Sequence, residues 1–169
     1  MITHIDKGFD FLGWNFRKFK GKLIVKPSKS SIKNLIRKCS TIIVKEGKAS
    51  TQSDLIRRLN MVLRGWTNYH KHVVASQTFS YVNNTLYSLL TKWAKHRHPN
   101  KSSRWRLTRY WHNNGNKPWV FMTSKYTLVN LRRIPIIRHP KLQISKTPFL
   151  DKEYYIVSIK RNTPYPRRL

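Results

Sequence analysis

The segment from Lys92 to Trp111 holds the densest group of side chains that could bind a ligand. Seven lysines and arginines alternate there with four aromatic residues and two histidines. Cationic side chains can pair with phosphates, while aromatic rings and guanidinium planes stack on unpaired bases. The mixture therefore predicts contact with a nucleic acid. The alternative is that Trp93 and Tyr110 belong to a protein core and that the cations form a solvated face.

A second polar group lies between Leu63 and His72. Arg64, Asn68 and Lys71 stand at i, i+4 and i+7. This spacing puts the three side chains on one face of a helix, where they could line up along a sugar-phosphate backbone. The sequence therefore predicts a row of phosphate contacts along this helix.

A cationic ridge is expected on the same helix. Arg57, Arg64 and Lys71 recur at every seventh residue, so they stay on one face and drift only about 20° per repeat. We expect this ridge opposite the buried stripe of the helix. Trp66 and Tyr69 are interpreted as packing residues rather than as stacking platforms for bases.

Metal binding and catalysis are not expected. Four histidines are spaced in pairs, but no carboxylate or thiolate stands near them to complete a metal site. They are His70, His72, His96 and His98. The six acids are scattered, whereas two-metal nucleotidyl chemistry needs clustered carboxylates. They are Asp6, Asp10, Glu46, Asp54, Asp151 and Glu153.

The charge balance points to a polyanionic partner. The chain carries 35 lysines and arginines against six acids, and no acid stands between Leu55 and Leu150. A folded chain with a net charge of +29 repels itself unless a polyanion neutralises it. Aromatic residues make up 12% of the sequence, which excludes a disordered basic tail. The single cysteine, Cys39, excludes a disulfide scaffold, and we expect an intracellular protein without a membrane span.

Hydrophobic periodicity predicts a mainly α fold. We expect a short β-hairpin over 9–26, in which the aromatic run 9–16 forms one strand and Lys20-Gly21 the turn. Three amphipathic helices that form a bundle should follow over about 28–46, 51–73 and 78–96. Ser28 or Ser30 should cap the first of these helices and Thr51 the second. Gly65 inside the second helix costs about 1 kcal/mol against Ala and suggests close packing or a bend. A short helix over 102–111 follows. Beyond it we expect an irregular basic tail with strands at 119–122, 134–137 and 154–159.

Several motifs, in chain order, resemble those of a known family. The stretch from Gly8 to Phe16 resembles the last block of a group II intron reverse transcriptase, where the palm domain passes into the thumb. A further set resembles its maturase-specific domain, also called domain X. These motifs are Leu59-Asn60, Arg64-Gly65-Trp66, Asn68-Tyr69, Trp93-Ala94, Arg97-His98-Pro99 and Trp105.

This resemblance implies the domains and the function. Residues 1–27 would be a remnant of the palm/thumb junction, 28–111 the thumb-like helical bundle, and 112–169 a basic tail. The bundle would bind group II intron RNA and help the intron to reach its splicing-active fold, with no cofactor and no catalytic residue. The expected RNA-binding residues are Arg57, Arg64, Asn68, Lys71, Lys92, Lys95, Arg97, Lys101, Arg104, Arg106 and Arg109. The tail resembles a DNA-contacting stretch, with Arg132, Arg133 and Arg138 as candidates.

Departures from the family leave alternatives open. The Tyr-x-Asp-Asp block of the polymerase centre is absent from the sequence, as are the paired cysteines of an H-N-H nuclease. We therefore expect no enzyme activity from this chain alone. It could be a thumb subunit that joins a separate palm polypeptide or a second copy of itself, or a truncated remnant without function. The split-enzyme hypothesis predicts an exposed aromatic surface at Phe9, Phe11 and Trp14. The expected location is the bacterial cytoplasm or an organellar matrix or stroma.

Overall fold

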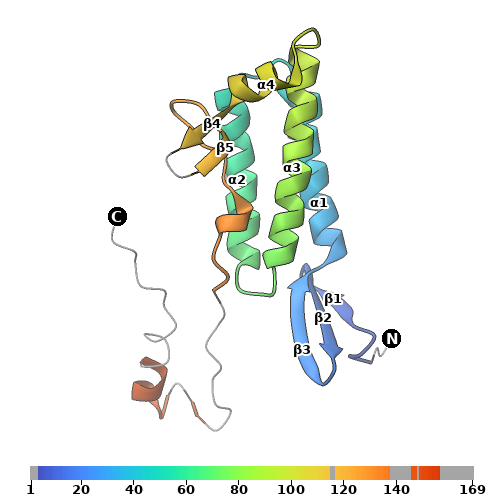
Figure 1. Cartoon of the computed structure of the whole chain (residues 1–169). Coiled ribbons are helices and arrows are strands. Elements are labelled where there is room, and N and C mark those ends of the chain that lie inside the picture. The colour runs from blue at the N-terminus through green and yellow to red at the C-terminus, as the bar shows by residue number, and fades with distance from the viewer. Residues whose placement is uncertain (1–3, 115–116, 138–145, 148, 157–169) are drawn as a thin grey trace.

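The structure is a computed structural model that describes residues 4–114, 117–137, 146–147 and 149–156. The predicted mainly α fold is confirmed. Three helices, α1 (Lys29–Ser40), α2 (Gln52–His70) and α3 (Ser76–Arg97), run side by side (Figure 1). No helix in the described ranges is long and apolar enough to cross a membrane.

One core joins the three helices. Its fully buried side chains come from the inner face of each helix and from the turn after α1, and their packing excludes water from the bundle axis. They include Cys39, Ile43, Leu55, Leu59, Leu63, Phe79, Val82 and Leu90. Each such aliphatic side chain contributes about 1.5 to 3 kcal/mol relative to an exposed one. The bundle is therefore a platform stable enough to hold surface side chains in place.

Helix starts fall where the capping residues predict them. The hydroxyl of Ser28 accepts a hydrogen bond from the backbone N–H of Ser31, 3.1 Å away. Thr51 caps α2 in the same way, through a 3.2 Å bond from the N–H of Asp54. Each cap of this kind is worth about 1 kcal/mol. After α1, a π-helical turn over 41–45 and a 3₁₀ turn over 46–48 confirm the expected helix end near Gly47.

The N-terminal strands differ from the expected hairpin. Three antiparallel strands form, β1 (Phe9–Phe11), β2 (Trp14–Phe19) and β3 (Lys22–Pro27), with β2 in the centre. The predicted turn at Lys20-Gly21 is present. A second turn at Leu12-Gly13, with φ of 48° and 79°, folds the aromatic run back on itself. The prediction of a single long strand there was wrong because Gly13 supplies a left-handed turn.

The sheet and α4 lie at opposite ends of the bundle. The sheet meets the loop between α2 and α3, where the N–H of Val74 donates to the carbonyl of Val25 at 2.9 Å. At the other end, α4 (Ser103–Tyr110) crosses the helices and leads into the strands β4 (Trp111–Asn114) and β5 (Lys117–Phe121) beside α2 (Figure 1). The predicted strand at 119–122 is thus largely confirmed.

Residues 119–134 fold back onto the bundle. Side-chain amides of α2 and α3 hold this segment by its backbone. Asn60 donates to the carbonyl of Thr127 at 2.8 Å and accepts from the N–H of Val129 at 2.9 Å, while Asn83 accepts from the N–H of Leu131 at 3.2 Å. Leu131 is fully buried. The first part of the expected tail is therefore packed against the bundle.

Other expectations for the tail fail or lie outside the described residues. No strand forms over 134–137, which follows a 3₁₀ turn, Leu131–Arg133. Proline at position 135 removes a backbone donor that a strand there would use. Residues 152–156 are helical where a strand was expected, and 157–159 lie outside the described ranges.

Candidate nucleic-acid interface

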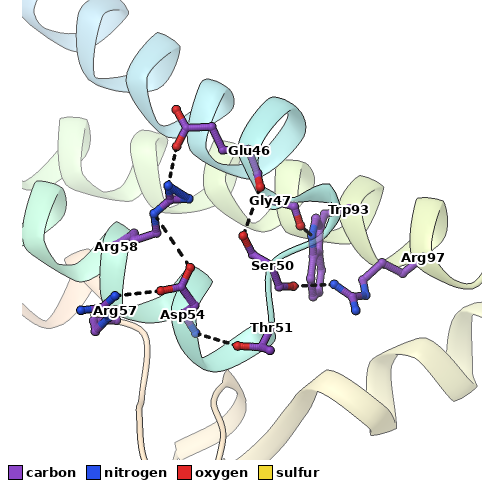
Figure 2. A network of polar contacts seen from close by, with 9 residues as sticks. All are labelled: Glu46, Gly47, Ser50, Thr51, Asp54, Arg57, Arg58, Trp93 and Arg97. Carbon is purple, nitrogen blue, oxygen red and sulfur yellow. Dashed lines mark hydrogen bonds and ion pairs between the residues drawn. The ribbon is translucent and has the colours of Figure 1, made fainter.

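Two of the six acids are paired with arginines where α1 passes into α2. Arg58 contacts both carboxylates, Glu46 at 2.8 Å and Asp54 at 3.9 Å. Arg57 lies 2.9 Å from Asp54. Figure 2 shows these groups together around the first turn of α2. Arg57, a predicted RNA contact, thus has a local carboxylate partner, which weakens the attraction between its guanidinium group and a phosphate. These exposed pairs add at most about 1 kcal/mol each to stability.

The predicted row on α2 lies on the surface. Arg64 and Asn68 are exposed, and Lys71 is half-buried. The ammonium of Lys71 donates to the side-chain oxygen of Asn68 at 3.2 Å, as expected for neighbours on one helix face. Among the described residues, no hydrogen bond or ion pair involves the guanidinium of Arg64. Its charge is therefore available to a ligand.

Two predicted RNA contacts bond to backbone carbonyls near the end of α3. Arg106 donates to the carbonyl oxygens of His98 and Lys101 and to the hydroxyl of Ser103. Arg97 donates to the carbonyl oxygen of Ser50 and lies 5.1 Å from the centre of the Trp93 ring (Figure 2). Both guanidinium groups satisfy backbone carbonyls that would otherwise need water. Both arginines therefore stabilise the local fold of this surface, in addition to being predicted RNA contacts.

The remaining cations of this segment face solvent. Lys92, Lys95, Arg104 and Arg109 are exposed, and within the described ranges no hydrogen bond or ion pair engages their charged groups. Lys101 lies 5.6 Å from the centre of the Trp105 ring, and that ring is 37% exposed. The end of α3 and the outer side of α4 thus present several unpaired cations and one accessible ring.

The aromatic residues divide between core and surface. Trp93 and Tyr110 are 4% and 7% exposed, so the core interpretation holds for both, and Trp111 is buried as well, at 3%. The indole N–H of Trp93 donates to the carbonyl of Gly47 at 2.7 Å (Figure 2). Only Trp105 among the four rings of this segment is placed to stack on a base.

His70 has a structural role that the sequence analysis missed. It is 1% exposed, and its Nδ1 accepts the indole N–H of Trp14 at 3.0 Å. Because an indole nitrogen only donates, the proton of the neutral ring must sit on Nε2, which then donates to the hydroxyl of Ser31, 3.1 Å away. Burial lowers the pKa of His70 to about 4. The sequence did contain a signal for the burial of His70, since it stands seven residues after the core residue Leu63 and so lies on the same face of the helix.

The same contacts correct one expectation for Trp14. Its ring is half-buried and stacks on Tyr69, with centroids 4.9 Å apart and planes at 18°. Phe9 and Phe11 are exposed as predicted, but Trp14 is not part of an open aromatic surface because it bonds to His70. Across the described residues, no group of three histidine, cysteine or acidic side chains could hold a metal ion.

An open groove of about 780 Å³ lies between α1 and α2 beside this network. Its lining includes Asn34 and Lys38 of α1, Met61 and Gly65 of α2, and Leu12 of the β1–β2 turn. No acid lines it. This groove could not be predicted from the sequence, because its walls come from three separate segments.

The candidate DNA contacts on the tail are only partly described. Arg132 donates to the side-chain oxygen of Asn84 on α3 at 2.6 Å, and Arg133 is exposed. Arg138 lies outside the described residues. Contact with DNA stays a prediction, as does each assignment of a cation to RNA.

Comparison with known families identifies the bundle. Residues 32–111 match the family described as group II intron, maturase-specific domain. A search of curated proteins finds no match to the chain. The matched range begins in α1 and ends at the first residue after α4, so it covers the bundle, the α2 row and the cations of α4. Residues 32–111 are therefore a group II intron maturase-specific domain, the kind of domain that is involved in the splicing of group II introns.

Proposed function

We propose that this chain binds group II intron RNA through the exposed cations of α2, α3 and α4 and stabilises the folded intron without making or breaking bonds itself. The observation that carries the proposal is that several of these cations have no hydrogen bond or ion pair within the described residues, namely Arg64, Lys92, Lys95, Arg104 and Arg109. Between Leu55 and Leu150 no acid is present to neutralise them. A surface of this kind gains free energy by releasing the counterions of a polyanion.

The mechanism follows from where the charges are held. Arg106 bonds to backbone carbonyls of the turn between α3 and α4 and keeps that turn in one conformation. Arg97 ties the end of α3 to the segment before α2 through the carbonyl of Ser50. Exposed neighbours such as Lys95 and Arg104 then meet phosphates from a pre-formed surface, which lowers the entropy lost on binding. Binding only to the folded RNA shifts the folding equilibrium of the RNA toward that state.

The first test is a titration of a transcribed group II intron RNA with the purified chain at several salt concentrations. If about six cations meet phosphates, the logarithm of the binding constant should fall with a slope of roughly five against the logarithm of the salt concentration. Affinity that does not change with salt would refute the mechanism.

A second test measures splicing itself. Stabilisation of the RNA fold should let the intron splice at a Mg²⁺ concentration that leaves the naked RNA inactive. The matched control is an Arg64→Ala, Arg104→Ala double variant, which removes two unpaired charges far from the core. Equal splicing with and without wild-type protein would contradict a role in RNA folding.

A second candidate function is supported by the sheet. Phe9, Phe11, Leu12 and Leu23 are between 43% and 69% exposed, an apolar surface of the kind that meets another protein domain. The chain would then serve as the thumb of a reverse transcriptase whose palm is a separate polypeptide. Co-expression with a candidate palm chain, followed by a primer-extension assay, tests it. A complex that fails to form would count against this function and leave RNA binding untouched.

A further inference from the structure

Gly65 occupies a position where glycine has no role inside the chain. It lies within α2, which continues as one α-helix from Gln52 to His70. A Cβ added at this position would meet no atom within 4 Å. Its φ is not positive, unlike those of Gly8, Gly13 and Gly21. The expectation of close packing within the chain is therefore not met, and the helix is not interrupted at this position.

A glycine in an exposed helix interior still has a cost. It lowers helix stability by about 1 kcal/mol relative to alanine. Neither backbone conformation nor packing within the described residues requires glycine at position 65. The reason for the absence of a side chain there must therefore lie in a binding partner. A partner that approaches the helix backbone closely at this point would explain it.

Gly65 lies in the groove between α1 and α2. Two aromatic residues of α2, Trp66 and Tyr69, line the groove next to it. The indole of Trp66 donates to the hydroxyl of Ser31 at 3.1 Å. Tyr69 is 45% exposed, and its hydroxyl donates to the carbonyl of Leu12 at 2.7 Å. Both rings are thus fixed before any ligand arrives, so little conformational entropy is lost when a flat group packs against them.

The polar row of α2, which consists of Arg64, Asn68 and Lys71, follows the edge of this groove. Arg64 stands three residues after Met61, and Asn68 three residues after Gly65, so each is a surface neighbour of a groove residue. Lys38 lines the opposite wall. Phosphates can therefore follow the row while one base enters the groove. Flanking cations and a lining without acids favour an RNA strand over a protein segment.

We propose that the groove between α1 and α2 accepts an unpaired nucleotide of the bound RNA, with Gly65 as the point where that nucleotide contacts the helix backbone. The inference rests on the proposed RNA binding and adds a site to it. The base would pack against Met61 and the exposed face of Tyr69, and its phosphate would pair with Arg64.

The test uses Gly65→Ala and Gly65→Leu in the full chain. Both variants should unfold at the same or a higher denaturant concentration than the wild type, since the new side chain meets open space and helix propensity rises. Binding of a hairpin RNA with an unpaired loop should weaken, by roughly fivefold or more for Gly65→Leu, which corresponds to the loss of one stacked base. Binding of a blunt, fully paired RNA duplex should not change. Gln77→Leu, at an exposed position of α3 away from the groove, is the matched control and should bind both RNAs like the wild type.

The outcomes separate this inference from the proposed function. A wild-type protein that binds neither RNA overturns both. A wild-type protein that binds the hairpin, together with a folded Gly65→Leu variant of equal affinity, overturns the groove alone, and this is also the result expected if a protein segment occupies it. Equal weakening for hairpin and duplex overturns the role of an unpaired nucleotide.

A measurement on the wild-type protein makes the test independent of any variant. Ultraviolet crosslinking to the hairpin RNA should place nucleotide adducts on the peptide that contains Met61 and Tyr69. Adducts confined to α4 would overturn the inference.

Discussion

The buried ring of His70 should make the protein lose stability as the pH falls below about 6.5. In the folded protein, burial holds the pKa of His70 at about 4, whereas the unfolded chain has the ordinary value near 6.5. Between these two values the unfolded state binds a proton that the folded state excludes. The free energy of unfolding therefore decreases as the pH is lowered through this range.

The size of the effect follows from the two pKa values. At pH 7.5 both states carry a neutral ring, so the contribution is close to zero. At pH 5 it amounts to about 2 kcal/mol, and below pH 4 it approaches the full difference of about 3 kcal/mol. The structure gives the reason for the low pKa: the ring is 1% exposed and Nδ1 accepts from an indole, so a proton there would break that bond.

The assay is urea unfolding at pH 7.5 and pH 5, followed by circular dichroism, for the wild type and for His70→Gln. The amide of glutamine can accept from Trp14 and donate to Ser31 but does not titrate. The other histidines contribute equally to both proteins, so the difference in pH dependence isolates His70. We expect the wild type to lose about 2 kcal/mol more than the variant between the two pH values. Identical losses would refute the assignment of a neutral, buried ring.

Three further predictions concern charge and packing. Arg64→Ala with Lys71→Ala should weaken RNA binding and lower the salt slope by about two, with unchanged helix content by circular dichroism. Trp93→Ala should lower the free energy of unfolding by about 3 to 5 kcal/mol, measured with urea, because it removes a buried indole and its bond to the backbone. Arg104→Ala should reduce RNA affinity alone, whereas Arg106→Ala should also lower the thermal midpoint because three hydrogen bonds in the α3–α4 turn are lost. Equal thermal midpoints for these last two variants would contradict the structural role of Arg106.

The helices could be predicted from the sequence because their signals are local. Ser28 and Thr51 begin α1 and α2 through bonds to residues three positions later, and apolar periodicity then marks the buried face of each helix. The turn at Leu12-Gly13 was missed because it interrupts a run of aromatic residues that reads as one strand. A left-handed leucine, with φ of 48°, has no signature in sequence.

The interface was less predictable than the fold. Sequence gives every arginine the same weight, but Arg106 and Arg97 point toward carbonyls that the fold brings near, while Arg104 does not. Such distinctions depend on contacts between separate segments. The return of residues 119–134 was hidden for the same reason, since the amides of Asn60 and Asn83 bond to backbone 48 to 69 residues away.

These amide contacts differ in kind from those that would hold RNA. Hydrogen bonds between uncharged groups and a buried Leu131 resist added salt, whereas attraction between exposed cations and phosphates is screened by it. Washing in concentrated sodium chloride should therefore strip co-purifying nucleic acid from the recombinant protein while the 119–134 segment stays docked. We therefore expect that bound nucleic acid can be removed from the chain without denaturing it.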